Sequence, residues 1–319
     1  MRKLILLLLL TSPMVLATNA AEQISAESWL NRLSNSLKSL NFSTSFVVVK
    51  NNQAEPYHWF HGVTEQGIEL EILSLLNGPR RDILRKDNII SYIEPELPPY
   101  SVLSNQVKGP IPNILSGNVD DIARTYDFVS VGKSRVLGRG AQLVRIVPKD
   151  DHRFGHWLWL DSETVMLLKL VVATKQGLLL EQIQFTHLDI ADKPSESVSQ
   201  LESTELPAVL EIPDGYQQQA LSWQVNWLPD GFKSVNTNRH RLTATKQAVE
   251  FTLFSDGLVD ISVYVNPTRE AQRATDFVFD GATVALNQVT NGMEVSVVGK
   301  IPSSTAKRIA DSVALRNGR

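Results

Sequence analysis

Two pairs of histidines have the residue type and spacing that could bind a metal ion. His58 and His61 are three apart, and His152 and His156 are four apart. A spacing of three places strand residues on opposite faces, and no helical pattern brings His152 and His156 to one side. Because the chain has no cysteine, it also lacks a Cys/His ligand set. These histidines therefore favour surface or packing roles, and we expect no metal site and no cofactor.

Short catalytic motifs are missing from the sequence. It contains no G-x-S-x-G elbow, P-loop or H-E-x-x-H. Gly138-Arg139-Gly140 lacks the third glycine of a dinucleotide fingerprint and is typical of a turn. Since a catalytic triad is defined by geometry, a secreted hydrolase with scattered residues stays open as an alternative. We nevertheless expect a binding protein rather than an enzyme.

Three tryptophans lie in strand-like segments. Trp157 and Trp159 are two apart and so share a face, and Trp59 belongs to another candidate strand. Aromatic side chains on a sheet usually pack in a core. A curved sheet can instead enclose one apolar ligand, such as an acyl chain. Both roles stay open for these residues.

A run of basic residues also has two interpretations. Arg80, Arg81, Arg85 and Lys86 could hold phosphates or acidic partner segments, because arginine presents paired donors to such groups. The alternative is a solvated strand edge that discourages aggregation.

The N-terminus is typical of an export signal. Arg2 and Lys3 precede the apolar run Leu4–Leu10, and small residues ending at Ala20 complete the pattern. We expect residues 1–20 to be removed and the protein to work in the periplasm. The loss of Arg2 and Lys3 lowers the basic count from 31 to 29 against 34 acidic residues, a formal charge of −5. This balance argues against a nucleic-acid partner.

Periodicity predicts one helix followed by many strands. Ile24–Leu40 has a helical stripe of apolar residues, with Ser25 or Ser28 available to cap its first turn. Alternation begins at Phe42 and predicts an antiparallel sheet. Its further strands are expected at Ile68–Leu75, Arg81–Arg85, Ile89–Glu94, Tyr126–Val131, Ala141–Val147, His156–Leu160, Val165–Thr174 and Leu178–Ile190, with Met166, Leu168, Leu170 and Val172 on one face.

Composition divides the rest of the chain. Five prolines between Glu94 and Gly117 predict a long rigid loop, followed by a short helix near Val119–Thr125. Residues 192–222 lose regular periodicity and are interpreted as a linker. The domain limits are therefore predicted at 21–191 and 223–319. In the second domain we expect a hairpin around Ser255-Asp256-Gly257, a strand at Val295–Gly299 and a final helix capped by Ser303 or Ser304.

Several strings, taken in order, resemble one known family. Together they are similar to the RseB/MucB family over essentially the whole mature chain, although no single string is decisive. The strings are Asn77-Gly78-Pro79-Arg80-Arg81, Ile90-Ser91-Tyr92-Ile93-Glu94-Pro95, Tyr126-Asp127-Phe128-Val129-Ser130-Val131-Gly132, Trp227-Leu228-Pro229-Asp230-Gly231-Phe232, Ser255-Asp256-Gly257-Leu258 and Thr305-Ala306-Lys307-Arg308-Ile309-Ala310.

The resemblance implies an α+β protein with two domains. The larger, N-terminal domain is expected to be an unclosed antiparallel β-barrel with helices, similar to the lipoprotein carriers LolA and LolB, and the smaller C-terminal domain to be α+β. The resemblance also implies a negative regulator of the sigma-E envelope stress response. Such a protein binds the periplasmic segment of an RseA/MucA-type anti-sigma factor and protects it from regulated proteolysis until lipid or lipopolysaccharide releases it.

Contact residues are our own inference from the sequence pattern, because the resemblance supplies no motif for them. For lipid we nominate apolar residues on the sheet of the large domain. For the anti-sigma partner we nominate residues on or beside the hairpin of the small domain. The lipid set is Phe46, Trp59, Trp157, Leu168 and Leu170, and the partner set is Arg239, Arg241, Phe254 and Asp256.

The hypothesis for the mechanism is a pair of mutually exclusive states, in which an acyl chain in the large domain weakens the peptide site. The main alternative is a periplasmic lipid or lipoprotein carrier that uses the same cavity for transport. A homo-oligomer is also possible.

Overall fold

The structure, a computed structural model, describes residues 24–104, 109–111, 119–210, 221–241, 248–268, 273–290 and 292–316. Its first element is helix α1 (Ala26–Ser39). Ser25 caps the helix by accepting a hydrogen bond from the Ser28 backbone N–H at 3.1 Å. The predicted helix and the Ser25 cap are therefore confirmed. Its apolar stripe is buried and consists of Ala26, Trp29, Leu30, Leu33 and Leu37.

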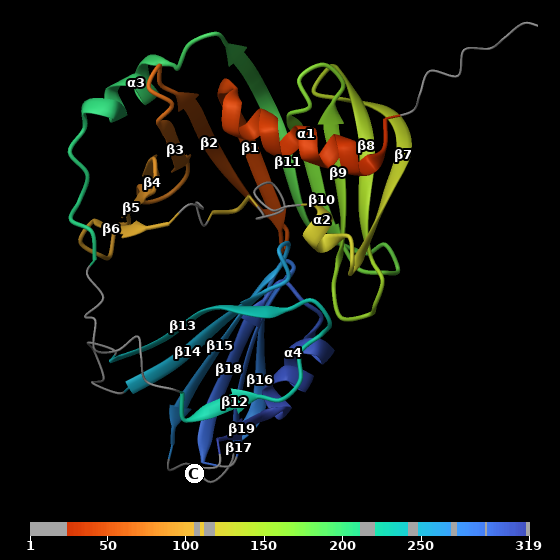
Figure 1. Cartoon of the computed structure of the whole chain (residues 1–319), viewed down its shortest axis with the longest axis vertical. Coiled ribbons are helices and arrows are strands. Elements are labelled where there is room, and N and C mark those ends of the chain that lie inside the picture. Colours follow the sequence, from red (N-terminus) through yellow and green to blue (C-terminus); the bar gives the residue numbers. More distant parts are fainter. Residues whose placement is uncertain are drawn as a thin grey trace, which may run out of the picture.

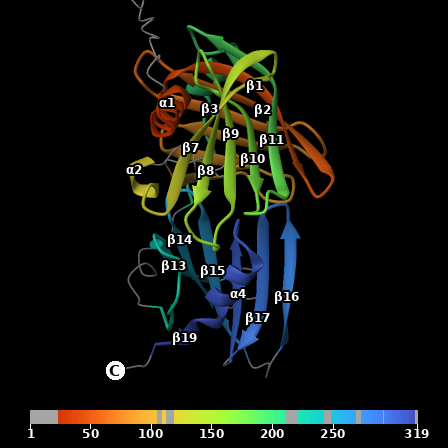
Figure 2. The same ribbon diagram turned by 90° about the vertical axis from the view of Figure 1, so that its right-hand side faces the viewer.

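A large antiparallel sheet of eleven strands follows α1 (Figures 1 and 2). Its order is β6-β5-β4-β3-β2-β1-β11-β10-β9-β8-β7, which joins strands from both ends of the domain through the β1–β11 pair. The strands are β1 (Asn41–Lys50), β2 (Gln53–Val63), β3 (Glu69–Leu75), β4 (Arg81–Lys86), β5 (Ile89–Ile93), β6 (Tyr100–Leu103), β7 (Tyr126–Val136), β8 (Arg139–Pro148), β9 (Gly155–Asp161), β10 (Leu167–Ala173) and β11 (Leu179–Ala191).

The two faces of this sheet differ in burial. Along β1, Phe42, Thr44, Phe46 and Val48 are buried and alternate with half-buried residues, as the sequence pattern predicts. The inner face packs against α1, which crosses the sheet in Figure 1. Edges β6 and β7 are not paired with each other, so the expected unclosed barrel is confirmed.

The predicted alternation fails in β10. The pairing with β9 shifts register between Leu167 and Lys169, which marks a bulge. As a result Leu167 joins Leu170 in the main hydrophobic core, whereas Leu168 is buried outside that cluster. The prediction of one face running through Leu168 was wrong, because sequence periodicity carries no signal for an inserted residue.

The proline-rich stretch is only partly a loop. Strand β6 lies within it and pairs with β5, and the Tyr92 and Tyr100 rings stack at 5.4 Å. Proline is tolerated immediately before an edge strand, so Pro98 and Pro99 do not prevent this pairing. The short helix is confirmed as α2 (Val119–Ile122). The prediction of a continuous loop was therefore wrong.

The stretch interpreted as a linker also contains regular structure. Helix α3 (Glu196–Ser203) buries Val198 and Leu201 against β2 and β3. Gly62 permits the approach, because a Cβ there would meet the Pro194 side chain at 2.8 Å. The expectation that this stretch has no regular structure was wrong. An eight-residue helix with only two buried apolar residues gives a weak periodic signal in the sequence. The domain limits themselves stay predictions.

The small domain is a second antiparallel sheet with one helix. Its six strands run in the order β13-β14-β15-β18-β17-β16, confirming the hairpin at Ser255-Asp256-Gly257 and the strand at Val295–Gly299. The elements are β13 (Lys233–Arg241), β14 (Ala248–Ser255), β15 (Asp260–Pro267), β16 (Arg273–Asp280), β17 (Thr283–Thr290), β18 (Met293–Gly299) and α4 (Ser303–Asp311), with β12 (Trp223–Val225) and β19 (Val313–Leu315) paired separately.

Helix α4 begins differently from the prediction. Pro302 is its N-cap residue, and no side chain caps the helix. The predicted cap by Ser303 or Ser304 was wrong, because both residues already belong to the helix. Ala306, Ile309 and Ala310 are buried as expected. None of the described helices is long and apolar enough to span a membrane.

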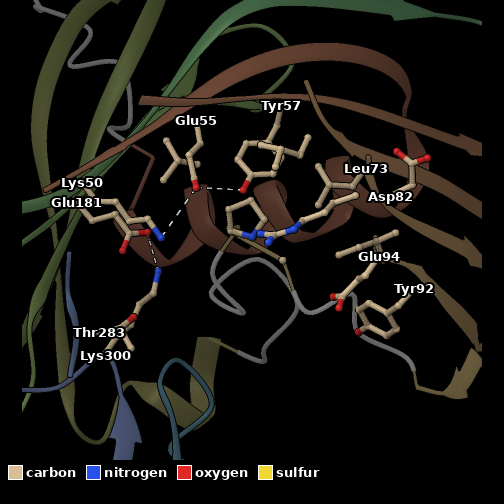
Figure 3. A pocket seen from close by; sticks show the side chains of 16 residues that line it. Lys50, Glu55, Tyr57, Leu73, Asp82, Tyr92, Glu94, Glu181, Thr283 and Lys300 are labelled. Carbon is tan, nitrogen blue, oxygen red and sulfur yellow. Dashed lines mark hydrogen bonds and ion pairs between the residues drawn. The ribbon is translucent and has the colours of Figure 1, made fainter. Parts of the chain in front are cut away.

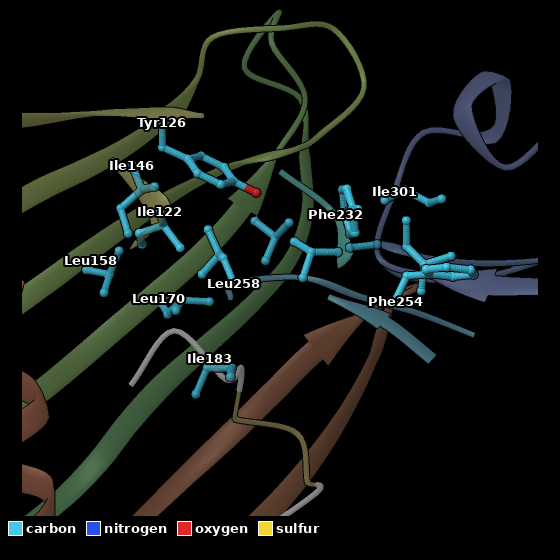
Figure 4. Packing of buried hydrophobic residues seen from close by; sticks show 14 of the residues in the cluster. Ile122, Tyr126, Ile146, Leu158, Leu170, Ile183, Phe232, Phe254, Leu258 and Ile301 are labelled. Atoms are coloured by element: carbon cyan, nitrogen blue, oxygen red, sulfur yellow. The ribbon is translucent and has the colours of Figure 1, made fainter. Parts of the chain in front are cut away.

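The hydrophobic core is continuous between the two domains. Figure 4 shows Ile122 and Tyr126 of the large domain beside Leu258 of the small one, with Phe232 and Phe254 further along. All five residues are buried in one cluster. The interface between the domains therefore contains packed apolar side chains and has the character of an interior.

Candidate binding site between the two domains

A cavity of about 320 Å³ lies on the inner face of the β1–β5 half of the large sheet, next to the small domain (Figure 3). This volume is within the range of about 300–1,000 Å³ typical of ligand pockets. One wall is apolar and the remainder carries charges. The lining residues are Val48, Lys50, Glu55, Tyr57, Leu73, Leu75, Arg81, Asp82, Ile83, Tyr92, Glu94, Gly109, Pro110, Glu181, Thr283 and Lys300.

Ion pairs connect the two domains at this cavity. Lys50 of β1 donates to Asp280 of β16 at 2.6 Å, and Lys300, which follows β18, donates to Glu181 of β11 at 2.7 Å. Burial lowers the pKa of Lys50, but its hydrogen bond and attraction to Asp280 outweigh burial and raise that pKa overall. Lys50 therefore carries a positive charge beside the cavity, which Lys300 also lines.

Tyr57 is the polar group of the apolar wall. Its hydroxyl donates to Glu55 at 3.2 Å, and its ring stacks on Phe46 at 5.3 Å. Burial, followed by the charge of Glu55, raises the pKa of Tyr57 to about 12. Arg81 lines the same space and has no ion-pair partner within the described ranges. An amphiphile with an acidic head would find an apolar wall, a phenol and a free cation here.

A second polar contact between the domains is completely buried. Asp256 accepts hydrogen bonds from Arg153 Nε at 2.7 Å and from the Tyr126 hydroxyl at 2.8 Å. The side chains of Arg153 and Asp256 are 0% exposed. The guanidinium also bonds to Asp150 and to the Asp230 carbonyl, and it lies over the Phe232 ring at 4.9 Å. One arginine of the large domain is thus held by several groups, three of them from the small domain.

The residues nominated for lipid do not form one site. Phe46 and Leu170 are completely buried in the core, and Leu168 is the bulge residue. Trp59 is 7% exposed and donates to Glu71 at 3.0 Å. Trp157 lies on the opposite face of the sheet. None of the five lines the cavity, so their role in lipid contact stays a prediction.

The residues nominated for the partner occupy the small sheet. Phe254 is buried in the core, and a partner could reach the Asp256 carboxylate only if the domains moved apart. Arg239 and Arg241 belong to β13, and in the strand register they lie opposite Glu250 and Ala248 of β14. Their side chains fall outside the described part of the structure. Partner contact by these four residues stays a prediction.

The histidines lie in different surroundings. His61 is buried near Glu69 and Glu71, with one possible ligand atom from each residue within 4.8 Å of the others. Arg85 donates to both carboxylates, at 2.5 and 2.6 Å, so the cluster has its own internal cation. Sequence reasoning missed this group because the two glutamates come from a neighbouring strand. His156 is fully buried, and burial, followed by the charge of Lys300, lowers its pKa to about 4.

The basic run is divided among separate contacts. Arg80 pairs with Asp82, Arg85 with the two glutamates, and Lys86 with the Glu202 carbonyl. Only Arg81 faces the cavity. The sequence pattern therefore indicated one residue of the cavity, Arg81, but not where it lies. It missed Lys50 and Lys300 because neither belongs to a cluster of basic residues in the sequence.

These features define a two-domain protein with a charged, partly apolar cavity at the domain junction. The chain belongs to the MucB/RseB family: the model of the MucB/RseB N-terminal domain matches residues 25–210, and that of the C-terminal domain matches residues 217–314.

Relatives are similar over nearly their full length. The chain is 30% identical to the sigma-E factor regulatory protein RseB of Salmonella typhimurium over 310 residues, 97% of this chain and 96% of that protein. It is 32% identical to the sigma factor AlgU regulatory protein MucB of Pseudomonas aeruginosa, covering 98% of each. The crystal structure of MucB in complex with MucA(peri) is 30% identical and matches with a TM-score of 0.73, covering 92% of this chain and 100% of that chain.

Proposed function

We propose that this protein is a periplasmic negative regulator of a sigma-E-type envelope stress response. It binds the periplasmic segment of an RseA/MucA-type anti-sigma factor and shields that segment from regulated proteolysis. The observation that carries this proposal is the match of both domains to the family, together with similarity at a TM-score of 0.73 to a MucB structure that contains MucA(peri).

An extended partner segment would bind beside the outer strand β13 of the small sheet. Within the described ranges β13 pairs only with β14, so its other edge can accept a strand. Val235 of β13 is 58% exposed, and Arg239 and Arg241 follow it in the same strand. Edge hydrogen bonds would supply affinity and the two arginines would select acidic residues of the partner.

A lipid would act at the cavity between the domains. Its acidic head would bind Arg81 and the lysines, and its apolar part would lie against Val48, Tyr57 and Leu73. Because the lining residues come from both domains, an occupant would alter their relative position and so weaken the partner site. Linkage then requires that the partner weaken lipid binding by the same factor.

A protease-protection assay tests the proposal. The anti-sigma periplasmic segment of the same genome is incubated with a site-1-type protease, with and without the mature chain. We expect cleavage to slow in proportion to complex formation and to recover when lipopolysaccharide is added. Cleavage at an unchanged rate would contradict the regulator. Co-purified lipid without any protection would favour the carrier alternative.

The variant Arg81→Gln distinguishes lipid binding from binding of the partner segment. This variant should protect the segment as well as the wild type but need more lipid for release, because its side chain lines the cavity and makes no ion pair within the described ranges. Arg135→Gln, at an exposed position of β7 outside the cavity lining, is the matched control.

A further inference from the structure

The outer face of strands β8, β9 and β10 carries an aromatic and cationic patch. In β9 the residues His156, Leu158 and Leu160 are buried on the inner face, so Trp157 and Trp159 point outward and are half-buried. Figure 2 views this side of the large domain, where β8, β9 and β10 have no described helix in front of them. The two indole rings are neighbours, with their centroids 6.4 Å apart.

Each tryptophan of the patch is covered by one cation. The Arg145 guanidinium lies 4.8 Å from the centre of the Trp157 ring, and Lys169 Nζ lies 5.0 Å from that of Trp159. Strand pairing explains both contacts, because Arg145 is opposite Trp157 and Lys169 is opposite Trp159. Neither cation has an acidic partner in the described part of the chain, and Arg145 Nε is buried without a hydrogen-bond acceptor.

The other half of the same outer face is covered by a helix. There α3 packs over the sheet, and Phe60, Ile72 and Leu84 contact the apolar cluster around Val198 and Leu201. The patch on β8–β10 has no comparable cover among the described elements. Apolar surface continues onto the adjacent strand β7, where Val129 and Val131 are 42% and 52% exposed.

The hydrogen-bonding capacity of the patch is one-sided. Arginine, lysine and the indole N–H are donors only, and the neighbouring outward residues Leu143 and Val147 are apolar. The carboxylate at the end of β9, Asp161, already accepts from Arg139 and Thr164. All three strands are paired along both edges, so no backbone is open for an added strand. A polypeptide laid here would leave its own N–H groups without acceptors. A phosphate headgroup offers acceptors only and is followed by apolar chains.

We propose that the outer face of β8–β10 is a peripheral docking surface for a bilayer of anionic phospholipid. The tryptophans lie at the level of the headgroups, as indole rings do at membrane interfaces, and the two cations bind phosphates. Each cation strengthens attachment by about fivefold at low salt. This surface is separate from the cavity, and the inference does not depend on the proposed function.

Co-sedimentation of the mature chain with vesicles tests this surface. Binding to phosphatidylglycerol vesicles should exceed binding to phosphatidylcholine vesicles, decline toward about 0.15 M salt because exposed charges are screened, and shift tryptophan emission to the blue. Arg145→Gln combined with Lys169→Gln should weaken binding by about 25-fold, the product of two fivefold losses.

The chain supplies a matched control for the charge change. In α4, Arg308 lies 3.8 Å from the centre of the Trp227 ring and Lys307 is adjacent, so Lys307→Gln with Arg308→Gln also removes two cations and one cation–aromatic contact. This control should bind vesicles as the wild type does. If the double variant of the patch fails to fold, as judged by circular dichroism, Lys169→Gln alone should still weaken binding by about fivefold.

Three results would overturn the inference. The first is equal binding to both kinds of vesicle. The second is an equal loss of binding in the patch and control variants. The third is a blue shift of tryptophan emission that an acidic peptide causes and vesicles do not, which would assign the patch to a polypeptide instead.

Discussion

Replacing Asp256 by Asn removes one charge from the buried contact between the domains. Asp256 accepts from Arg153, from Tyr126 and from the backbone N–H groups of Leu258 and Val259, at 2.7 to 2.9 Å. Asn has a single acceptor oxygen, so its amide N–H groups would face some of these donors. The Arg153 guanidinium would also lose a counter-charge inside the core.

The expected cost follows from burial. Removing one partner of a fully buried ion pair costs about 3–5 kcal/mol, because the remaining charge is uncompensated. Arg153 keeps its contact with Asp150, whose side chain is 29% exposed and still supplies a negative charge. We therefore expect Asp256→Asn to lower the free energy of unfolding by about 3 kcal/mol, the lower end of that range.

A double-mutant cycle measures the interaction itself. Urea unfolding is followed by tryptophan fluorescence for the wild type, Asp256→Asn, Arg153→Met and the double variant. Because the double variant contains neither buried charge, it should be more stable than the sum of the single losses predicts, by about 2 kcal/mol. Lys307→Gln, at an exposed ion pair of α4, serves as the control and should change stability by less than about 1 kcal/mol.

The reasoning would be refuted by either of two outcomes. One is an Asp256→Asn protein within about 0.5 kcal/mol of the wild type, the range typical of surface substitutions. The other is strict additivity in the cycle, which would mean that the two side chains do not interact energetically.

Three further changes follow from the same structure. Tyr57 has a pKa raised from 10.0 to about 12, so its stabilising contribution is complete below pH 10 and is lost as pH rises through 12. Because burial also raises the pKa of Tyr126 well above 10.0, ultraviolet titration should show one fewer late phenol in Tyr57→Phe than in the wild type. His156 has a pKa lowered from 6.5 to about 4, so its contribution to stability is present above pH 6.5 and is lost as pH falls toward 4. The melting temperature of His156→Gln should therefore fall less between pH 6.5 and pH 4 than that of the wild type. An equal fall in both proteins would contradict the assignment. Gly231 has φ +87° and a Cβ there would meet Thr125 at 2.8 Å, so Gly231→Ala should cost about 1–3 kcal/mol in denaturant unfolding, whereas Gly67→Ala, with a similar φ and open space, should cost less.

Periodicity was sufficient where one element buries one regular face. Helix α1 has its stripe at Trp29, Leu33 and Leu37, and β1 alternates strictly, so both were predictable. The β14–β15 hairpin was also predictable, because Gly257 adopts a φ of +94° that the turn requires. These are local signals, and local signals are what a single sequence contains.

Short or irregular elements were not predictable in the same way. The bulge at Leu168 and the eight-residue helix α3 depend on contacts with other strands. The cavity depends even more on contacts between distant segments. Lys50 and Tyr57 line it together with Thr283 and Lys300, which come more than two hundred residues later. Sequence patterning correctly placed Trp157 and Trp159 on one face of β9 but could not tell which face, because both faces carry large apolar residues.

The most direct test of the central claim is calorimetric titration of the mature chain with the periplasmic segment of its anti-sigma factor. The account predicts a saturable heat of binding that weakens when an acidic amphiphile occupies the cavity between the domains. It also predicts that the segment weakens amphiphile binding by the same factor. No heat of binding to the segment would contradict the account, and so would affinities for the two ligands that do not depend on each other.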